Sequence, residues 1–342
     1  MMLTMYYEND TNSSSLNLVV KLRDEIRLSF TSLDTLHCVY AKGAVMIVFK
    51  VCYDQGGSTK SRGARFGPEA IEAAFYKSPW RGAEDGSSHP GIHWVRSIAS
   101  LEIYRKKAES LFSEALMPFI SLSGDNSCSF ETVRVVAQHV KHVALAVLDA
   151  HPDACDFDHD PHAYWVRKLW DEGIVTPEKT IFFGIRDPEE EEMQFIQKKR
   201  AMVVTPNAID LGYFLSDGVS DDNVSMRRKS DRPFFHSEIY DRWQPFSEHA
   251  LVIIVDIDVL DPACAPGTGV LRAGGLNVRD ILNIIRRLCT LPFMVKIGEI
   301  CEVIPEEGNI LRSKSDQRPD PCGLTVLAAE AIFREMIRSM EQ

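Results

Sequence analysis

The stretch Val143-Ala-Leu-Ala-Val-Leu-Asp-Ala-His-Pro-Asp153 decides the fold of this chain. Its apolar part is as long as a fully buried strand, and it ends abruptly in Asp149, His151 and Asp153. Side chains two residues apart on an extended chain point the same way. The sequence therefore predicts three side chains of the metal-ligand type converging at the C-terminal end of a buried strand.

A second stretch, Leu251-Val-Ile-Ile-Val-Asp-Ile-Asp258, repeats this design and ends in Asp256 and Asp258. A single Asp after a strand commonly caps a loop, but like charges that gather beside buried strands need a counter-ion. The two stretches together offer four carboxylates and one imidazole, with no thiolate. Such an oxygen-rich set favours Mn²⁺ or a similar hard divalent ion over structural Zn²⁺.

Both stretches carry motifs of a known family. Asp149-Ala-His-Pro-Asp153 and Asp256-Ile-Asp-Val-Leu-Asp-Pro262 resemble the two signatures of the ureohydrolases, which include arginase, agmatinase and formimidoylglutamase. Further motifs extend the resemblance from about Val48 to near the C-terminus. Gly63-Ala-Arg-Phe-Gly-Pro68 is similar to an agmatinase segment, and the Asn-x-Pro loop that arginases place after the first signature has no counterpart. The resemblance thus favours an agmatine-like guanidino substrate, with arginase and formimidoylglutamase activity left open.

Strand-like and helix-like segments alternate along the chain, which favours an α/β fold with a parallel sheet covered on both faces. The resemblance implies three layers, α/β/α, around a mostly parallel sheet of about eight strands, as in arginase. Residues 1–15 are polar and predict a flexible tail, and residues 16–28 have apolar positions at helical spacing. We expect one arginase-like domain over residues 16–342, with a polar surface insertion near 216–238.

The resemblance also implies a pair of Mn²⁺ ions with a water that bridges them. The ions would lower the pKa of that water, and the resulting hydroxide would attack a guanidinium carbon, so that urea and an amine are released. Asp149 would lie close to both ions and would count among the catalytic residues. The ligands that the two signatures supply are Asp149, His151, Asp153, Asp256 and Asp258.

Two further residues match positions that handle the substrate in the family. Glu302, in Glu299-Ile-Cys-Glu302, matches the glutamate that grips the guanidinium through a charge-assisted hydrogen bond. His162 matches the catalytic histidine that contacts the substrate and transfers protons, with His159 as the alternative alignment.

The segment Gly124-Asp-Asn-Ser127 departs from the family pattern Gly-Gly-Asp-His-Ser. The family's histidine is a metal ligand, and Asn126 takes its place here. An amide oxygen is a weaker donor than an imidazole for a transition metal. We therefore predict that one of the two ions binds weakly. A metal-poor homologue with a regulatory or structural role is the alternative that this departure leaves open.

The composition limits which classes of partner the protein is expected to bind and where in the cell it is expected to lie. The 342 residues are 45% hydrophobic and 25% charged, with a formal net charge of -11. This charge argues against nucleic acid and anionic membranes, which bind basic surfaces. The eight cysteines are scattered without a Cys-x-x-Cys pair, and no apolar run approaches the ~18 residues of a membrane span. We expect a cytoplasmic protein, and the resemblance suggests a homo-oligomer, either a trimer or a hexamer.

Overall fold

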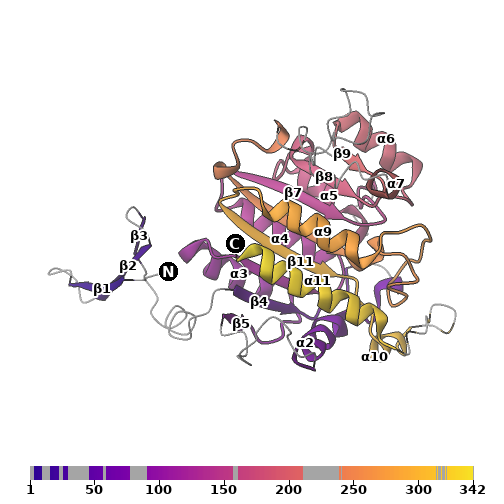
Figure 1. Cartoon of the computed structure of the whole chain (residues 1–342), viewed down its shortest axis with the longest axis horizontal. Coiled ribbons are helices and arrows are strands. Elements are labelled where there is room, and N and C mark those ends of the chain that lie inside the picture. Colours follow the sequence, from indigo (N-terminus) through magenta and orange to yellow (C-terminus); the bar gives the residue numbers. More distant parts are fainter. Residues whose placement is uncertain are drawn as a thin grey trace, which may run out of the picture.

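A parallel sheet of eight strands forms the centre of the molecule (Figure 1). The computed structural model describes residues 4–9, 16–22, 26–29, 46–56, 59–77, 91–156, 161–210, 239, 241–312, 314, 317, 320 and 322–341. In this sheet the strand order is β5-β4-β6-β11-β10-β7-β8-β9, and every neighbouring pair is parallel. The strands are β4 (Met46–Val51), β5 (Ile92–Trp94), β6 (Phe119–Ser123), β7 (His142–Leu148), β8 (Thr180–Phe183), β9 (Met202–Val204), β10 (His249–Asp256) and β11 (Val295–Cys301).

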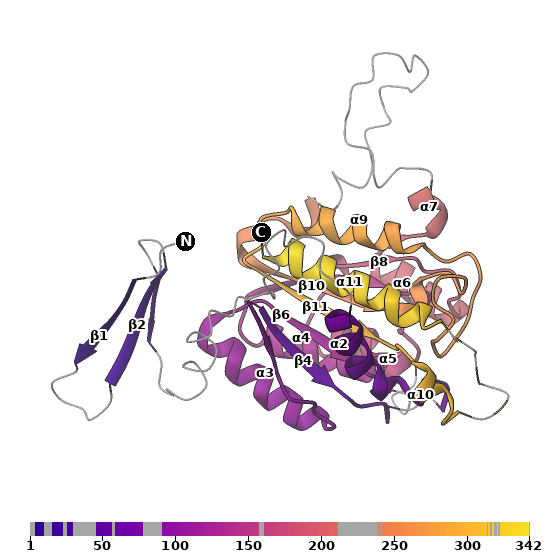
Figure 2. The ribbon, with the colours of Figure 1, turned by 60° about the horizontal axis from the view of Figure 1, so that its bottom comes forward.

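Helices cover both faces of this sheet, which confirms the predicted three-layer α/β/α fold. One apolar core lies between the sheet and α2, α7, α9 and α11, and the other between the sheet and α3, α4, α5 and α6. Figure 2 shows α9 and α11 along one face, with α3, α4 and α5 across the sheet from them. The helices are α2 (Gly67–Lys77), α3 (Leu101–Ala115), α4 (Ser127–Ala137), α5 (Pro161–Asp171), α6 (Glu190–Lys199), α7 (Pro206–Asp210), α9 (Val278–Cys289), α10 (Glu306–Asn309) and α11 (Leu324–Met340).

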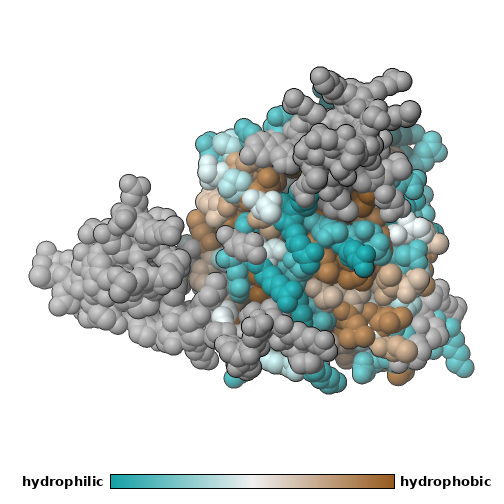
Figure 3. Space-filling model, in the orientation of Figure 1, coloured by the Kyte–Doolittle hydropathy of each residue, from teal (hydrophilic) through white to brown (hydrophobic). Residues whose placement is uncertain are grey.

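The sequence of the strands explains why two cores form. Successive side chains of a strand point to opposite faces, and strands buried on both faces are apolar throughout. On β4, Met46 and Val48 therefore enter one core, while Ile47 and Phe49 enter the other. The helix α4 has no exposed residue, whereas other helices, such as α3 and α9, keep an exposed side. Figure 3 shows hydrophilic residues over α9 and the C-terminal part of α11, while Leu324 and Leu327 near the start of α11 are exposed apolar side chains.

This topology sets the place where the polar side chains meet. The strands β6, β11, β10 and β7 are consecutive in the sheet, and all four run in the same direction. Their C-terminal ends therefore lie side by side at one edge, which is where open α/β sheets bind their ligands. The predicted metal-ligand motifs and Glu302 follow these strands directly.

The N-terminal region differs from the prediction. A helix was expected within residues 16–28, but β2 (Leu16–Leu22) and β3 (Ile26–Ser29) are strands there, and the expectation was wrong. Alternate residues from Leu16 to Leu22 are apolar, so this segment also has the period of a strand. Part of the expected tail is also a strand, β1 (Thr4–Asn9), and the three strands form a separate antiparallel sheet.

Two other expectations keep their standing as predictions. The polar insertion near 216–238 lies outside the described residues, and the assignment of 16–342 to one domain stays a prediction. Among the helices that the structure describes, none is long and apolar enough to cross a membrane.

Gly184 closes β8 in a conformation that other residues rarely adopt, with φ +93°. A Cβ atom at this position would lie 2.5 Å from Val259 Cγ2 and 3.2 Å from the carbonyl oxygen of Asp149. The absence of a side chain therefore lets the chain pass close to the strand end that carries Asp149.

We predict that Gly184→Ala lowers the free energy of unfolding by more than the ~1–2 kcal/mol that a left-handed backbone alone costs. The matched control is Gly173→Ala, where φ is +68° and no atom lies within 4 Å of the added Cβ. This control should lose only the backbone contribution. Urea denaturation of both variants measures the difference, and equal losses would contradict the close approach at Gly184.

Candidate functional site

A cavity of about 370 Å³ opens at the C-terminal ends of the four central strands. Five of the six predicted metal ligands line it, together with Glu302 and His162. The sixth, Asp149, is buried beside it and contacts His151. His162 lies in the first turn of α5, where a loop had been expected, and His159 is outside the described residues. The structure thus brings together the residues that the sequence singled out.

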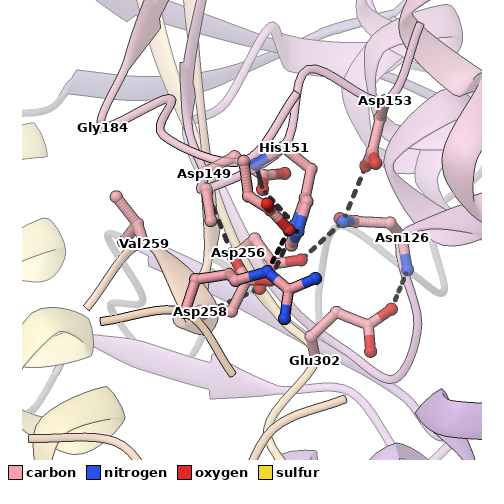
Figure 4. Close-up of polar contacts among 12 residues, drawn as sticks. Asn126, Asp149, His151, Asp153, Gly184, Asp256, Asp258, Val259 and Glu302 are labelled. Carbon is pink, nitrogen blue, oxygen red and sulfur yellow. Dashed lines mark hydrogen bonds and ion pairs between the residues drawn. The ribbon is translucent and has the colours of Figure 1, made fainter. Parts of the chain in front are cut away.

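Asp149, His151 and Asp258 form the part of the site that suits a metal ion best (Figure 4). One ligand atom of each lies within 4.8 Å of the other two, and His151 Nδ1 is 3.0 Å from Asp258 Oδ2. Asp149 Oδ2 is buried, and it has no hydrogen-bond partner among the described residues. A buried carboxylate oxygen without a donor is costly, so this set fits a divalent cation.

The backbone holds these three side chains in place. The backbone N–H of His151 donates to Asp149 Oδ1 at 2.7 Å, and that of Ala150 donates to Asp258 Oδ1 at 3.1 Å. The N–H of Asp258 in turn donates to Asp256 Oδ1 at 2.8 Å. The turn after β7 therefore holds carboxylates of both strand ends, Asp149 and Asp258, while the turn after β10 holds Asp256.

The pKa values of the buried side chains show that the site favours bound positive charge. Burial, followed by the charge of Asp258, raises the pKa of Asp149 to about 7. Burial also raises the pKa values of Asp153 and Asp256 well above their usual range. Burial alone would lower the pKa of His151, but the neighbouring carboxylates outweigh it and raise that pKa to about 12. The charge of His151 in turn helps to lower the pKa of Asp258. Without a metal, the cluster therefore favours protons on its other carboxylates and an imidazolium beside Asp258, and a bound cation would displace these protons.

The surroundings of Asn126 differ from those of a metal ligand. Its Nδ2 donates to Asp153 Oδ2 at 3.0 Å and to Asp256 Oδ2 at 2.6 Å. Its Oδ1, the atom that could bind a metal, instead accepts from Cys301 Sγ at 2.7 Å and from Ser129 Oγ at 3.2 Å. Asn126 therefore lies among the predicted ligands, but its amide N–H groups face the carboxylates (Figure 4).

Two other groups hold this arrangement. Asp153 Oδ2 accepts a second hydrogen bond, from Trp165 Nε1 at 2.7 Å. Ser129 Oγ also donates to the buried Glu299 at 2.7 Å, and burial raises the pKa of Glu299 to about 7. The oxygens of Asp153 and Asp256 that would meet a second ion are thus already supplied with donors. This position fits a cation less well than the one beside His151.

Glu302 combines an anchored oxygen with an open one. Its Oε1 accepts from the backbone N–H of Asn126 at 3.0 Å. Its Oε2 is buried and has no hydrogen-bond partner within the described parts of the chain. Burial, followed by the charge of Asp125, raises the pKa of Glu302 to about 8. Because it lines the cavity, Glu302 offers a carboxylate oxygen to a cationic group of a ligand.

Several cavity residues were not predicted from the sequence. Thr268 Oγ1 is buried, lines the cavity and has no hydrogen-bond partner among the described residues. Asp187 Oδ2 lies 3.3 Å from His151 Nε2 and also accepts from Arg272. No sequence signal marks Thr268 or Arg272, because both lie in an irregular loop after β10. Asp187 ends a strand-like segment whose last residues, Gly184-Ile-Arg-Asp187, resemble a ureohydrolase motif, and this resemblance could have marked it.

Comparison with known proteins agrees with this geometry. The family model described as "Arginase family" matches residues 44–214 and 225–337. An agmatinase from Bacillus anthracis is 25% identical over 289 residues, which cover 80% of this chain and 85% of that protein.

Two solved structures share the fold. The proclavaminate amidino hydrolase from Streptomyces clavuligerus has a TM-score of 0.64 and 24% identity, with 87% of this chain and 92% of that chain covered. The formimidoylglutamase from Bacillus subtilis has a TM-score of 0.66 and 23% identity, with 87% of each chain covered. The cluster at the strand ends, the eight-stranded parallel sheet and the family match over most of the sequence lead to one conclusion: the chain belongs to the arginase family.

Proposed function

We propose that this protein is a metal-dependent ureohydrolase that cleaves the guanidino group of a small molecule to urea and an amine. One observation carries the proposal. Glu302, whose Oε2 has no hydrogen-bond partner among the described residues, lines the same cavity as His151 and Asp258, so a guanidinium held by Glu302 would lie beside the cation site. Membership of the arginase family supports the same reaction class.

The side chains divide the work by position. Glu302 would bind and orient the substrate cation through Oε2 while the Asn126 backbone fixes Oε1. His162, on the cavity wall, would pass a proton to the leaving amine. A divalent ion, when bound, lowers the pKa of a coordinated water toward neutral and so supplies the nucleophile. We propose Mn²⁺, since the cluster is rich in carboxylate oxygen. We assign Asp149 to the catalytic group because its buried Oδ2 has no hydrogen-bond partner among the described residues and would bind the ion.

Agmatine is the first substrate to try, because the curated relatives include agmatinases. Arginine and formimidoylglutamate remain open, since the structural relatives include an arginase and a formimidoylglutamase. A cytoplasmic location and a trimeric or hexameric assembly stay predictions.

The alternative role, a metal-poor homologue without activity, is favoured by one observation. The amide of Asn126 supplies donors to Asp153 and Asp256, so the site is partly satisfied without a second cation. Metal content and urea release separate this role from the enzymatic one.

The first prediction concerns metal content. After dialysis, the protein should retain about one Mn²⁺ per chain, because among the described residues predicted as ligands it is Asp149, beside His151, that has a buried oxygen without a hydrogen-bond partner. Asn126→His should raise the content toward about two, since imidazole is the better donor. Asp258→Ala should abolish binding. Elemental analysis checks all three, and two firmly held ions in the wild type would contradict the role given to Asn126.

The second prediction concerns Glu302. At saturating Mn²⁺, Glu302→Gln should lower kcat/KM for the preferred guanidino substrate by about 10- to 100-fold, as expected for loss of a hydrogen bond between charged groups. A urea assay measures this loss. The control is Glu102→Gln on the outer side of α3, where the side chain is 67% exposed and paired only with Lys106. If both variants match the wild type, Glu302 does not hold the substrate.

A further inference from the structure

The cavity carries positive side chains that the proposed reaction does not use. Lys60 and Arg272 line it together with Glu302 and the metal-ligand cluster. The metal cluster would bind cations and Glu302 a guanidinium, and neither of these tasks uses a basic side chain at the border of the same space. Their presence points to a second, anionic group on the ligand.

The acidic side chains on the same wall are mostly engaged within the protein. Asp187 accepts from Arg272 and lies against His151. Glu192 is buried and accepts from the backbone N–H groups of Ala154 at 2.9 Å and Glu189 at 3.0 Å. Apart from the metal cluster and Glu302, the remaining acidic side chain on the described part of the wall is that of Glu189, which accepts from the backbone N–H of Glu192 at the start of α6.

Arg272 is placed firmly enough to select a ligand. Arg186 donates to its carbonyl oxygen from Nε at 3.2 Å and from Nη2 at 2.9 Å, and also to the carbonyl oxygen of Asp258 at 2.7 Å. The loop that carries Arg272 is therefore tied to the strand end that carries the metal-ligand cluster. The Nε of Arg272 is held by Asp187, while its side chain stays 54% exposed.

Arginine suits a carboxylate better than other basic groups do. Its planar guanidinium offers paired N–H donors that match the two oxygens of a carboxylate. A site in which the arginine is already oriented loses less entropy on binding. Val270 also lines the cavity and gives it an apolar side chain against which methylene groups can pack.

On the basis of the proposed function, we propose that the substrate carries a carboxylate at the end opposite its guanidino group, and that Arg272 binds this carboxylate. The substrate class is then the guanidino acids. The distal amine of agmatine would meet Arg272 and Lys60 instead, and like charges at that end disfavour it.

The test compares matched substrates on the full-length, Mn²⁺-loaded protein. The series is 4-guanidinobutyrate, butylguanidine and agmatine, which differ at the distal end, together with the shorter guanidino acids and their alkyl counterparts. At the best chain length, kcat/KM for the acid should exceed that for the alkyl compound by about tenfold or more, with agmatine lowest. Arg272→Met should bring the ratio of the two kcat/KM values close to one, mainly by raising KM for the acid. Arg272→Lys should retain part of it.

Metal content and thermal unfolding of both variants separate a lost charge from a disturbed site, because Asp187 connects Arg272 with His151. Arg272→Lys keeps a cation beside Asp187 and is the control for that effect. A wild type that prefers agmatine, or an Arg272→Met variant with unaltered ratios, would overturn the inference and leave the proposed function intact.

A different result would overturn the proposed function. If no guanidino compound releases urea, calorimetric measurement of the binding of 4-guanidinobutyrate and butylguanidine still tests whether Arg272 binds a carboxylate. Tighter binding of the acid by the wild type, but not by Arg272→Met, would support the carboxylate site. Equal binding of both compounds by both proteins would contradict it.

Discussion

The crowding of buried carboxylates at four adjacent strand ends is the constraint on which this site depends. Parallel strands bring Asp149, Asp153, Asp256 and Asp258 to one edge of the sheet, where water is scarce and like charges repel. The repulsion is relieved either by a bound cation or by protons that remain on these side chains. The raised pKa values of Asp149 and His151 are the metal-free answer to this repulsion, and a divalent ion is the alternative.

Asn126 changes how that repulsion is met. A neutral amide with two N–H groups can satisfy one oxygen each of Asp153 and Asp256 without adding charge. Its own oxygen is held on the other side by Cys301 and Ser129, and Ser129 is in turn bound to the buried Glu299. Asn126 is therefore part of a hydrogen-bond network that reaches α4 and β11. The position beside His151 then fits a cation better than the position beside Asn126.

The sequence allowed the sheet and most of the cluster to be predicted, because apolar runs that end in aspartates mark both the strands and their polar ends. The direction of the Asn126 amide was out of reach, since it depends on Cys301 and Ser129, which lie on other elements. The cavity role of Arg272 depends on a loop folding back onto Asp187. The N-terminal helix was predicted wrongly because the segment from Leu16 to Leu22 fits a strand period as well as a helical one.

The most direct measurement of the central claim is an anomalous difference map from crystals soaked in Mn²⁺, collected at the manganese absorption edge. The account predicts a dominant peak among Asp149, His151 and Asp258, with Asn126 Nδ2 still facing Asp153 and Asp256. Two peaks of equal height, one of them within bonding distance of the Asn126 side chain, would contradict it, and so would the absence of any peak at the cluster.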